Sequence, residues 1–190
     1  MLKQGPKGWK IISHKKVYYN EYLEIFEDEL SIDGVKKLYI QGNIKNYSTI
    51  VPFITNDEII VIKSYRHLVD SIQIELPSGY IESGETHKDA ALRELKEETG
   101  YVPKKMKLIG EYTLDYSMFN QKGYVFVAYE LSKNHEQSLG LMEKIDIDFL
   151  SIKQIKQLLR EGKIMNAASI VALCKALDFH ERSDRKQGLT

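Results

Sequence analysis

Residues 76–101 read LPSGYIESGETHKDAALRELKEETGY, and this stretch decides the fold. Its second half predicts a short helix, because Thr86 is a favourable residue before the first helical turn and Gly100 suits the left-handed position after the last one. The apolar side that this helix turns toward a core consists of Ala91, Leu92 and Leu95. The stretch therefore predicts one amphipathic helix that packs against the rest of the chain.

Three carboxylates lie on the other side of the predicted helix. Glu94, Glu97 and Glu98 are spaced i, i+3 and i+4, so their side chains converge within one turn and repel one another. A divalent cation turns this repulsion into attraction, and Mg²⁺ and Mn²⁺ prefer oxygen ligands. The cluster indicates either a metal site, with Arg93 holding one carboxylate in place, or a solvated acidic helix surface.

A fixed frame around the carboxylates favours the metal site. Gly79 is followed after five residues by Glu85, and seven residues further on by RELKEETG at 93–100. This pattern resembles the Nudix box at every defined position except the last, where Tyr101 replaces the usual aliphatic residue. The resemblance implies a Nudix hydrolase, which uses water to cleave a diphosphate attached to another group.

Composition sets the broad class of the protein. The 190 residues suffice for one sizeable core, and 43% hydrophobic with 28% charged residues is typical of a globular protein. The 27 basic and 27 acidic residues cancel, so no global field favours nucleic acid or membrane as a partner. No apolar run reaches the roughly 18 residues of a membrane span, and no secretory signal is visible, so we expect a cytoplasmic location.

Hydrophobic patterning predicts the remaining elements. Alternating apolar and polar residues over 10–40 predict two or three antiparallel strands, with a hairpin turn at Asp33-Gly34. Further strands are expected at 48–54, 59–65, 73–76, 107–114, 124–131 and 145–150, and helices at 151–161 and 166–179. We therefore predict the α/β class: a Nudix-type α/β/α sandwich with a mixed sheet, plus an N-terminal antiparallel β extension.

Similarity to one branch of the family covers most of the chain. The N-terminal strands, SYRHLVDSIQIELPSGYIESGE at 64–85 and EGKIMNAASIVALCKAL at 161–177 resemble ADP-ribose pyrophosphatases. This resemblance implies a homodimer that pairs or exchanges the N-terminal strands, although an edge sheet on a monomer is the alternative. The expected organisation is a β extension at 1–47 used for dimerisation, a Nudix domain at 48–181 and a polar tail at 182–190.

The resemblance also implies the metal-binding residues. Glu94 and Glu98 would be the principal ligands of Mg²⁺, with Mn²⁺ as a substitute, and Glu97 would be a ligand or a supporting anchor. The backbone carbonyl of Ser78 would be a further ligand, and Gly79 would let the backbone approach the metal and the phosphates. Glu85 would either orient Arg93 or reach the metal through water; these two roles stay open.

Two further groups are expected to act on substrate. The resemblance implies that a glutamate on a loop ahead of the penultimate helix positions or deprotonates the attacking water, and the matching region GLMEKIDID at 140–148 offers Glu143 or, as second choice, Asp146. Arg66 would pair with phosphate and Glu75 with ribose hydroxyls. For each of these groups a solvated surface carboxylate or ion pair is the alternative.

The implied substrate is a nucleoside diphosphate derivative. The leading prediction is hydrolysis of ADP-ribose or a related nucleoside diphosphate sugar to a nucleoside monophosphate and a sugar phosphate. Tyr116 lies where many ADP-ribose hydrolases carry a proline, and a tyrosine there is more reminiscent of dinucleoside polyphosphate hydrolases. A third reading is a non-catalytic nucleotide-sugar sensor, which would not need the carboxylates on the helix.

Overall fold

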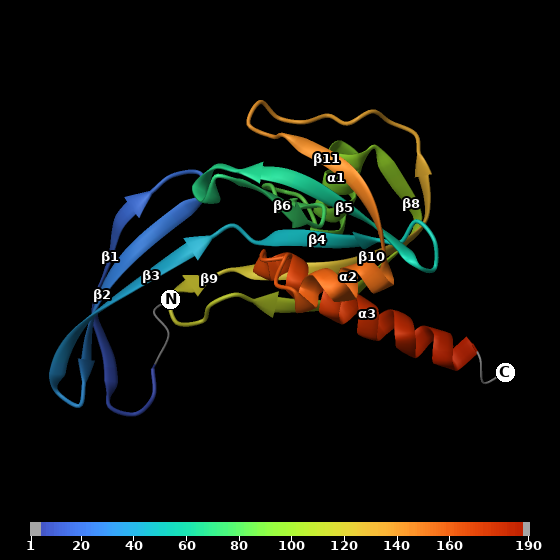
Figure 1. Cartoon of the computed structure of the whole chain (residues 1–190). Helices are drawn as coiled ribbons and strands as arrows, with labels where there is room; N and C mark the ends of the chain where they lie inside the picture. The colour runs from blue at the N-terminus through green and yellow to red at the C-terminus, as the bar shows by residue number, and fades with distance from the viewer. Residues whose placement is uncertain (1–4, 188–190) are drawn as a thin grey trace. The chain divides into compact units, whose positions relative to one another are not determined.

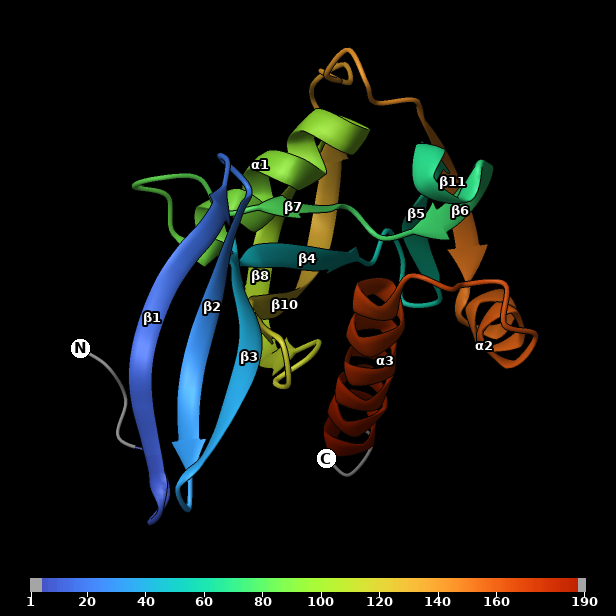
Figure 2. The same cartoon turned by 90° about the vertical axis from the view of Figure 1, so that its left-hand side faces the viewer.

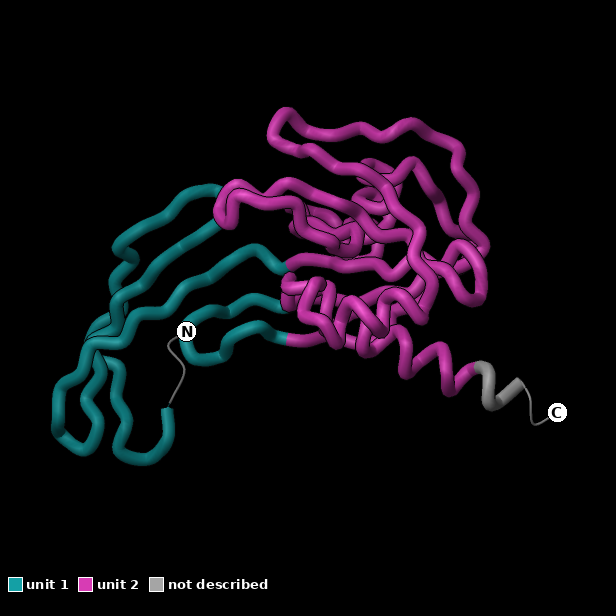
Figure 3. Tube along the Cα trace, in the orientation of Figure 1, with its two compact units in different colours: residues 1–46, 113–122 teal, residues 47–112, 123–190 magenta. Residues whose placement is uncertain are grey.

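The computed structural model describes residues 5–187 and divides into two compact units (Figure 3). Unit 1 contains residues 1–46 and 113–122, and unit 2 contains residues 47–112 and 123–190. Residues 113–122 thus cluster with the N-terminal strands, whereas the sequence predicted them to belong to the Nudix domain. The functional boundaries at 47 and 181 stay predictions.

Unit 1 is built on a four-stranded sheet with the order β1-β2-β3-β9. Its strands are β1 (Trp9–Tyr19), β2 (Leu23–Ile32), β3 (Val35–Ile44) and β9 (Phe119–Asn120). The first three strands pair antiparallel, and β3 pairs parallel with β9. Asp33 and Gly34 turn the predicted hairpin between β2 and β3 with φ values of 50° and 86°.

Unit 1 buries little apolar surface. Leu30 is its only buried apolar side chain among the described residues. Many of its large apolar side chains are exposed instead, including Trp9, Tyr18, Val35, Leu38 and Ile40. A sheet with so much apolar surface open to solvent is a candidate for covering by another protein surface.

Unit 2 contains two sheets and all three α-helices. One sheet has the order β7-β4-β10-β8 and is mixed, because β4 pairs parallel with β10 and antiparallel with β7. The other has the order β11-β5-β6 and is antiparallel. The strands are β4 (Tyr47–Pro52), β5 (Glu58–Arg66), β6 (Ser71–Glu75), β7 (Ser78–Tyr80), β8 (Tyr101–Thr113), β10 (Lys122–Lys133) and β11 (Ile145–Ser151). The helices are the short 3-10 helix η1 (His67–Val69), α1 (His87–Thr99), α2 (Ile152–Arg160) and α3 (Ala167–Gln187).

Helices α1 and α3 lie on opposite faces of the mixed sheet (Figures 1 and 2). Successive residues of a strand point to opposite faces, and Ser48 of β4 faces α1, where its hydroxyl donates to the carbonyl of His87 at 2.7 Å. Val51, three residues further along β4, therefore points to the opposite face, into a core that includes Ala172 and Leu173 of α3. This arrangement confirms the predicted α/β sandwich with a mixed sheet.

The structure corrects several details of the sequence prediction. It adds β7, β9 and η1, and it extends α3 past Phe179 to Gln187, into the segment expected to be a polar tail. Leu92 was predicted to face the core, but it is only half-buried, and the core side of α1 is Ala90, Ala91, Leu95, Glu98 and Thr99. Within residues 5–187, no helix is long and apolar enough to cross a membrane.

Candidate active site

Both ends of α1 are fixed by its own sequence. The Thr86 hydroxyl accepts a hydrogen bond from the backbone N–H of Asp89 at 3.2 Å, as expected for an N-terminal cap. Gly100 adopts φ 76° and its N–H donates to the carbonyl of Lys96 at 2.8 Å. An added Cβ at Gly100 would also come within 2.1 Å of the His135 carbonyl oxygen. The helix that carries the three glutamates is therefore held in a defined position.

Two of these glutamates turn toward β7. The Glu98 carboxylate accepts a hydrogen bond from the backbone N–H of Ser78 at 3.0 Å. Glu94 lies so close to Gly79 that an added Cβ at this glycine would be 1.7 Å from Glu94 Oε1. Gly79 is thus required by close approach to the carboxylate. Both carboxylates are removed from solvent, with side-chain exposure of 12% for Glu94 and residue exposure of 5% for Glu98.

Arg93 binds three acidic side chains of the motif. Its Nε and Nη2 donate to the two oxygens of Glu85 at 2.9 and 3.1 Å, a bidentate pair. Its Nη1 donates to Glu94 at 2.7 Å and to Glu97 at 3.2 Å. Its Nη2 also donates to the carbonyl of Tyr80 at 3.0 Å, which ties α1 to the end of β7. Glu85 is therefore bound to Arg93, and its role in orienting Arg93 or in reaching the metal through water stays a prediction.

The three carboxylates of α1 do not meet at one point. Glu97 is 41% exposed and turns to Arg93, whereas Glu98 turns to Ser78. Within the part of the chain that the structure describes, no three His, Cys, Asp or Glu side chains form a group arranged to hold a metal ion. The convergence expected from spacing alone is thus incomplete, because Arg93 attracts Glu97 and one oxygen of Glu94.

The electrostatics of the site nevertheless suit a cation. Burial, together with the negative charges of Glu94 and Glu143, raises the pKa of Glu98 well above its usual range. Burial also raises the pKa of Glu94 despite its bond to Arg93. Among the described residues no basic side chain forms an ion pair with Glu98. Buried carboxylates are normally paired or bound to metal, so two oxygen-donor groups beside a glycine cradle fit a divalent cation.

Arg66 and Glu75 bind each other. Nε and Nη2 of Arg66 donate to the two oxygens of Glu75 at 2.9 and 2.6 Å. Glu75 is 3% exposed, whereas the Arg66 side chain is 47% exposed. The pair raises the pKa of Arg66, with smaller contributions from the charges of Glu98 and Glu143. The guanidinium is therefore electrostatically close to the carboxylates of the site, and its outer edge remains open.

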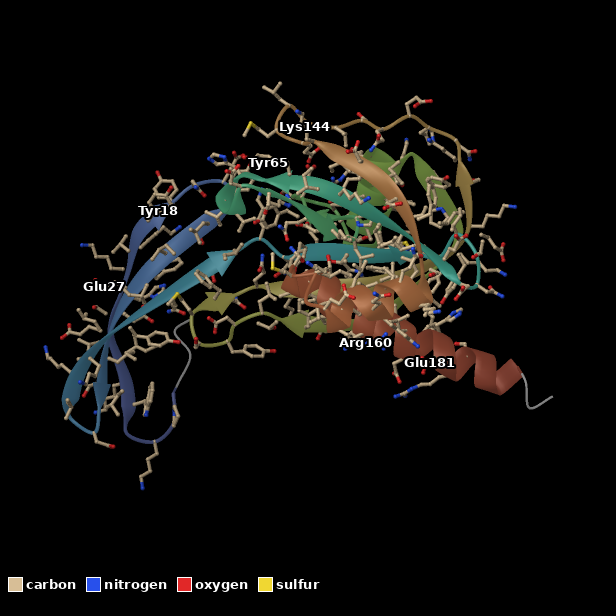
Figure 4. The ribbon with its side chains drawn as sticks, in the orientation of Figure 1. Tyr18, Glu27, Tyr65, Lys144, Arg160 and Glu181 are labelled. Carbon is tan, nitrogen blue, oxygen red and sulfur yellow. The ribbon has the colours of Figure 1, made fainter. Side chains whose placement is uncertain are left out.

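Glu143 lies in the loop between β10 and β11. Its carboxylate accepts a hydrogen bond from the backbone N–H of Gly140 at 2.7 Å, and its charge acts on both Glu94 and Glu98. The neighbouring Lys144 carbonyl accepts from the N–H of Tyr65 at 3.2 Å, and Figure 4 labels these two residues at the same edge of unit 2. The second choice, Asp146, lies on β11 opposite Lys63 and is exposed.

Sequence reasoning missed the contacts that fix this loop. The Gln137 side-chain amide donates to the carbonyls of Glu98 at 2.7 Å and Ile145 at 3.3 Å, and the N–H of Ser138 donates to the carbonyl of Glu97 at 2.9 Å. These bonds satisfy carbonyls at the C-terminal end of α1, which helices leave without an internal partner. A glutamine in a polar loop gives no sequence signal for such a role.

A surface depression of about 420 Å³ lies on the outer side of α1. Its lining consists of Glu85, Asp89, Leu92, Arg93, Lys96, Glu97 and Ser138. Neither Glu94 nor Glu98 belongs to this lining, so the depression is separate from the buried carboxylates that face β7.

Comparison with known proteins shows similarity over most of the chain. A solved structure described as an ADP compounds hydrolase superposes with a TM-score of 0.82 at 22% identity, covering 96% of this chain and all of that one. The ADP-ribose pyrophosphatase of Bacillus subtilis (strain 168) is 25% identical over 86% of this chain and 90% of its own. That of Escherichia coli (strain K12) is 27% identical over 94% and 92%.

A third relative carries a different name. The methanol dehydrogenase activator of Bacillus methanolicus is 31% identical over 63% of this chain and 66% of its own length. The model of the NUDIX domain matches residues 45–172, which include every site residue described above. This chain belongs to the Nudix family of hydrolases.

Proposed function

We propose that the protein is a divalent-metal-dependent pyrophosphatase that cleaves ADP-ribose or a related nucleoside diphosphate sugar. The products would be a nucleoside monophosphate and a sugar phosphate. The observation that carries this proposal is the pair of buried carboxylates, Glu94 and Glu98, that α1 presents to Ser78 and Gly79. Similarity to ADP-ribose pyrophosphatases over most of the chain supports the substrate class.

The metal-binding residues of the proposal are Glu94, Glu98 and the carbonyl of Ser78. Glu97, which is already bound to Arg93, would join as a ligand or anchor. A bound Mg²⁺ or Mn²⁺ would neutralise phosphate charge and lower the pKa of a coordinated water. Glu98 keeps its orientation through the Ser78 N–H, and Arg93 limits the positions open to Glu94.

Glu143 is the proposed general base. Its charge influences Glu94 and Glu98, so its carboxylate lies within electrostatic reach of the site. Its present bond to the Gly140 N–H is local to the loop, and turning away from that bond would free the carboxylate for water. Asp146 is the second choice; it lies on β11 opposite Lys63 rather than in the loop.

Arg66 is the proposed contact for a substrate phosphate. Glu75 holds the guanidinium from its buried side, which fixes the orientation of the open edge. In this arrangement Glu75 positions Arg66, and contact between Glu75 and ribose hydroxyls would require a carboxylate oxygen to accept further bonds. Arginine is suited to this task because its planar donors match phosphate oxygens.

The second candidate substrate is a dinucleoside polyphosphate. Tyr116 favours it in the sequence, and in the structure this side chain is 87% exposed within unit 1 and available for stacking. A non-catalytic sensor is the third candidate. The presence of all three α1 carboxylates argues against a sensor, because ligand binding alone does not require them.

A substrate panel separates the three candidates. Purified protein is incubated with ADP-ribose, other nucleoside diphosphate sugars and dinucleoside polyphosphates, each with Mg²⁺ or Mn²⁺, and the released nucleotides are separated by chromatography. The proposal predicts the highest kcat/KM for ADP-ribose or another diphosphate sugar. A preference for dinucleoside polyphosphates would favour the second candidate, and turnover of no compound with metal present would favour the sensor.

A further inference from the structure

Ser169 makes a buried contact that links α3 to the metal-binding turn. Its hydroxyl oxygen accepts a hydrogen bond from the backbone N–H of Leu76 at 3.0 Å. Ser169 is 1% exposed and Leu76 is fully buried, so water does not compete for this bond. The two residues are 93 positions apart in sequence, and the bond joins the first turn of α3 to the segment between β6 and β7.

The start of α3 fixes the backbone of Ser169, which carries this hydroxyl. Asn166 precedes the helix, and its side-chain oxygen accepts from the N–H of Ser169 at 3.0 Å. Its carbonyl accepts from the N–H of Ile170 at 3.0 Å, which is the first helical bond of this turn. Asn166 therefore acts as the N-terminal cap and Ser169 stands at the third helical position. The segment NAAS at 166–169, which resembles ADP-ribose pyrophosphatases, thus has a physical role here.

The turn between β6 and β7 has few donors to hold it. Pro77 has no N–H, so residues 76–78 offer two backbone donors, Leu76 and Ser78. Leu76 donates to Ser169 of α3, and Ser78 donates to the carboxylate of Glu98 of α1. The Pro77 carbonyl accepts a hydrogen bond from the N–H of Ile50 at 3.0 Å, which ties the turn to β4. These three bonds, together with the pairing of β7 with β4, hold the backbone on both sides of the Ser78 carbonyl.

We propose that Ser169 is a positioning residue for the metal site. It holds the Leu76–Gly79 turn so that the Ser78 carbonyl and the Glu98 carboxylate face the same point. This inference rests on the proposed metal site, and it adds a residue of α3 that contacts neither metal nor substrate. Removal of groups that orient metal ligands typically lowers metal affinity about 10–100-fold.

The test measures Mn²⁺ binding by the full chain without substrate. Free Mn²⁺ is followed by electron paramagnetic resonance for the wild type and for Ser169→Ala, which removes the acceptor oxygen. We expect the Mn²⁺ dissociation constant to rise about tenfold or more. The Leu76 N–H would lose its partner in a dry environment, and the turn would shift to find another acceptor.

Two variants control for nonspecific effects. Ser183→Ala removes a hydroxyl from the same helix whose bond to the Phe179 carbonyl at 3.0 Å stays within α3. Ile155→Val removes a methylene from the core cluster that contains Leu76, and it lowers stability without touching the turn. Both variants should bind Mn²⁺ like the wild type. Weakening by Ile155→Val equal to that by Ser169→Ala would overturn the proposal, because general destabilisation would then explain the loss.

The outcomes for the metal site and for Ser169 are distinguishable. A wild type that binds no Mn²⁺ contradicts the metal site itself, and the role of Ser169 falls with it. A wild type that binds, with folded Ser169→Ala binding equally well, contradicts only the positioning role. If Ser169→Ala does not fold, amide hydrogen exchange on the wild type tests the proposal instead. The Leu76 amide should exchange slowly and more slowly with Mg²⁺ added, and exchange that is insensitive to Mg²⁺ would contradict the proposed coupling.

Discussion

The backbone of Gly79 and the carboxylate of Glu94 lie closer together than a Cβ at position 79 would allow. The predicted Cβ distance of 1.7 Å to Glu94 Oε1 is far below van der Waals contact, so any side chain at position 79 must displace Glu94. At the residue scale, the site therefore depends on the absence of a side chain at position 79 as much as on the charged groups around it.

Gly79→Ala should lower activity and Mn²⁺ affinity about 10–100-fold, because Glu94 would be pushed from the position that Arg93 gives it. Steady-state kinetics and metal titration measure the two effects. Gly110→Ala is a matched control, since its Cβ would meet only the flexible end of Lys175 at 3.1 Å. Wild-type activity in Gly79→Ala would show that the position of Glu94 does not matter.

Glu143→Gln should reduce kcat by about 10²-fold with little change in KM, since the amide cannot accept a proton from water. Asp146→Asn is the paired variant, because Asp146 was the other loop carboxylate proposed from sequence. A larger loss in Asp146→Asn than in Glu143→Gln would transfer the role of base to Asp146.

Local interactions at the residue scale were predictable, and distant ones were not. The Thr86 cap and the left-handed Gly100 follow from neighbouring residues and are confirmed. The pairing of Arg66 with Glu75 depends on how η1 and its flanking strands β5 and β6 fold, so the sequence could only suggest each group separately. The contact between Ser169 and Leu76 depends on the whole core of unit 2.

The first half of the loop between β10 and β11 links α1 to β11. Its backbone and Gln137 occupy the carbonyls at the end of α1, and Gln137 also reaches the first residue of β11. The loop that carries Glu143 is thereby held at both of its ends. At the element scale, α1 supplies the metal-binding groups and also supports the segment that carries the proposed base.

Gln137→Leu should lower kcat severalfold while metal affinity stays unchanged, since the loop would lose its link to α1 but Glu94 and Glu98 would keep theirs. Each of the two lost hydrogen bonds is worth about 1 kcal/mol, so the folded state should persist. Gln157→Leu is the control, because the Gln157 amide donates to Glu161 at the exposed end of α2, away from the site. If both variants showed equal kcat values, the loop would not need this anchor.

The strands that were predicted are those with a hydrophobic pattern in their own sequence. Long alternating or β-branched runs gave the hairpin of unit 1 and the strands β4, β5 and β10 to within a few residues. Strand β7 is SGY, which has no hydrophobic periodicity, and β9 contains only Phe119 and Asn120. Both form because a neighbouring strand offers backbone partners, and that information is absent from their own sequences.

Cys174 of α3 is exposed although it lies within the apolar run IVALCKAL at 170–177. The buried side of this helix is formed instead by Ala168, Ser169, Ala172, Leu173, Ala176 and Leu177. Small residues let α3 approach the mixed sheet closely. An apolar helix side is thus easy to predict, whereas its direction around the helix axis requires the packing partner.

At the scale of the whole molecule, the exposed sheet of unit 1 requires an explanation. Val35 and Leu38 are 58% and 68% exposed, and other apolar residues of the same sheet are also open. Burial of such surface contributes roughly 25 cal/mol per Å². We propose that a second copy of the chain covers this sheet, as the resemblance to ADP-ribose pyrophosphatases implied.

Light scattering coupled to size-exclusion chromatography should give the mass of a dimer at micromolar concentration. Leu38→Asp should shift the protein toward monomer, because a charge would be buried in the interface. Lys10→Asp, on the same sheet but at an already polar position, should leave the dimer intact. A monomeric wild type at all concentrations would contradict this proposal without affecting the proposed chemistry.

We propose that Glu98, held by Ser78 and buried beside Glu94, binds the metal that diphosphate cleavage requires. The most direct measurement is the rate of nucleoside monophosphate release from the best substrate, compared between wild type and Glu98→Gln at saturating Mg²⁺. We predict a rate at least about 10²-fold lower in the variant, with an unchanged circular dichroism spectrum, and loss of wild-type activity with a chelator. Equal rates in a folded Glu98→Gln, or wild-type turnover that a chelator does not affect, would contradict the claim.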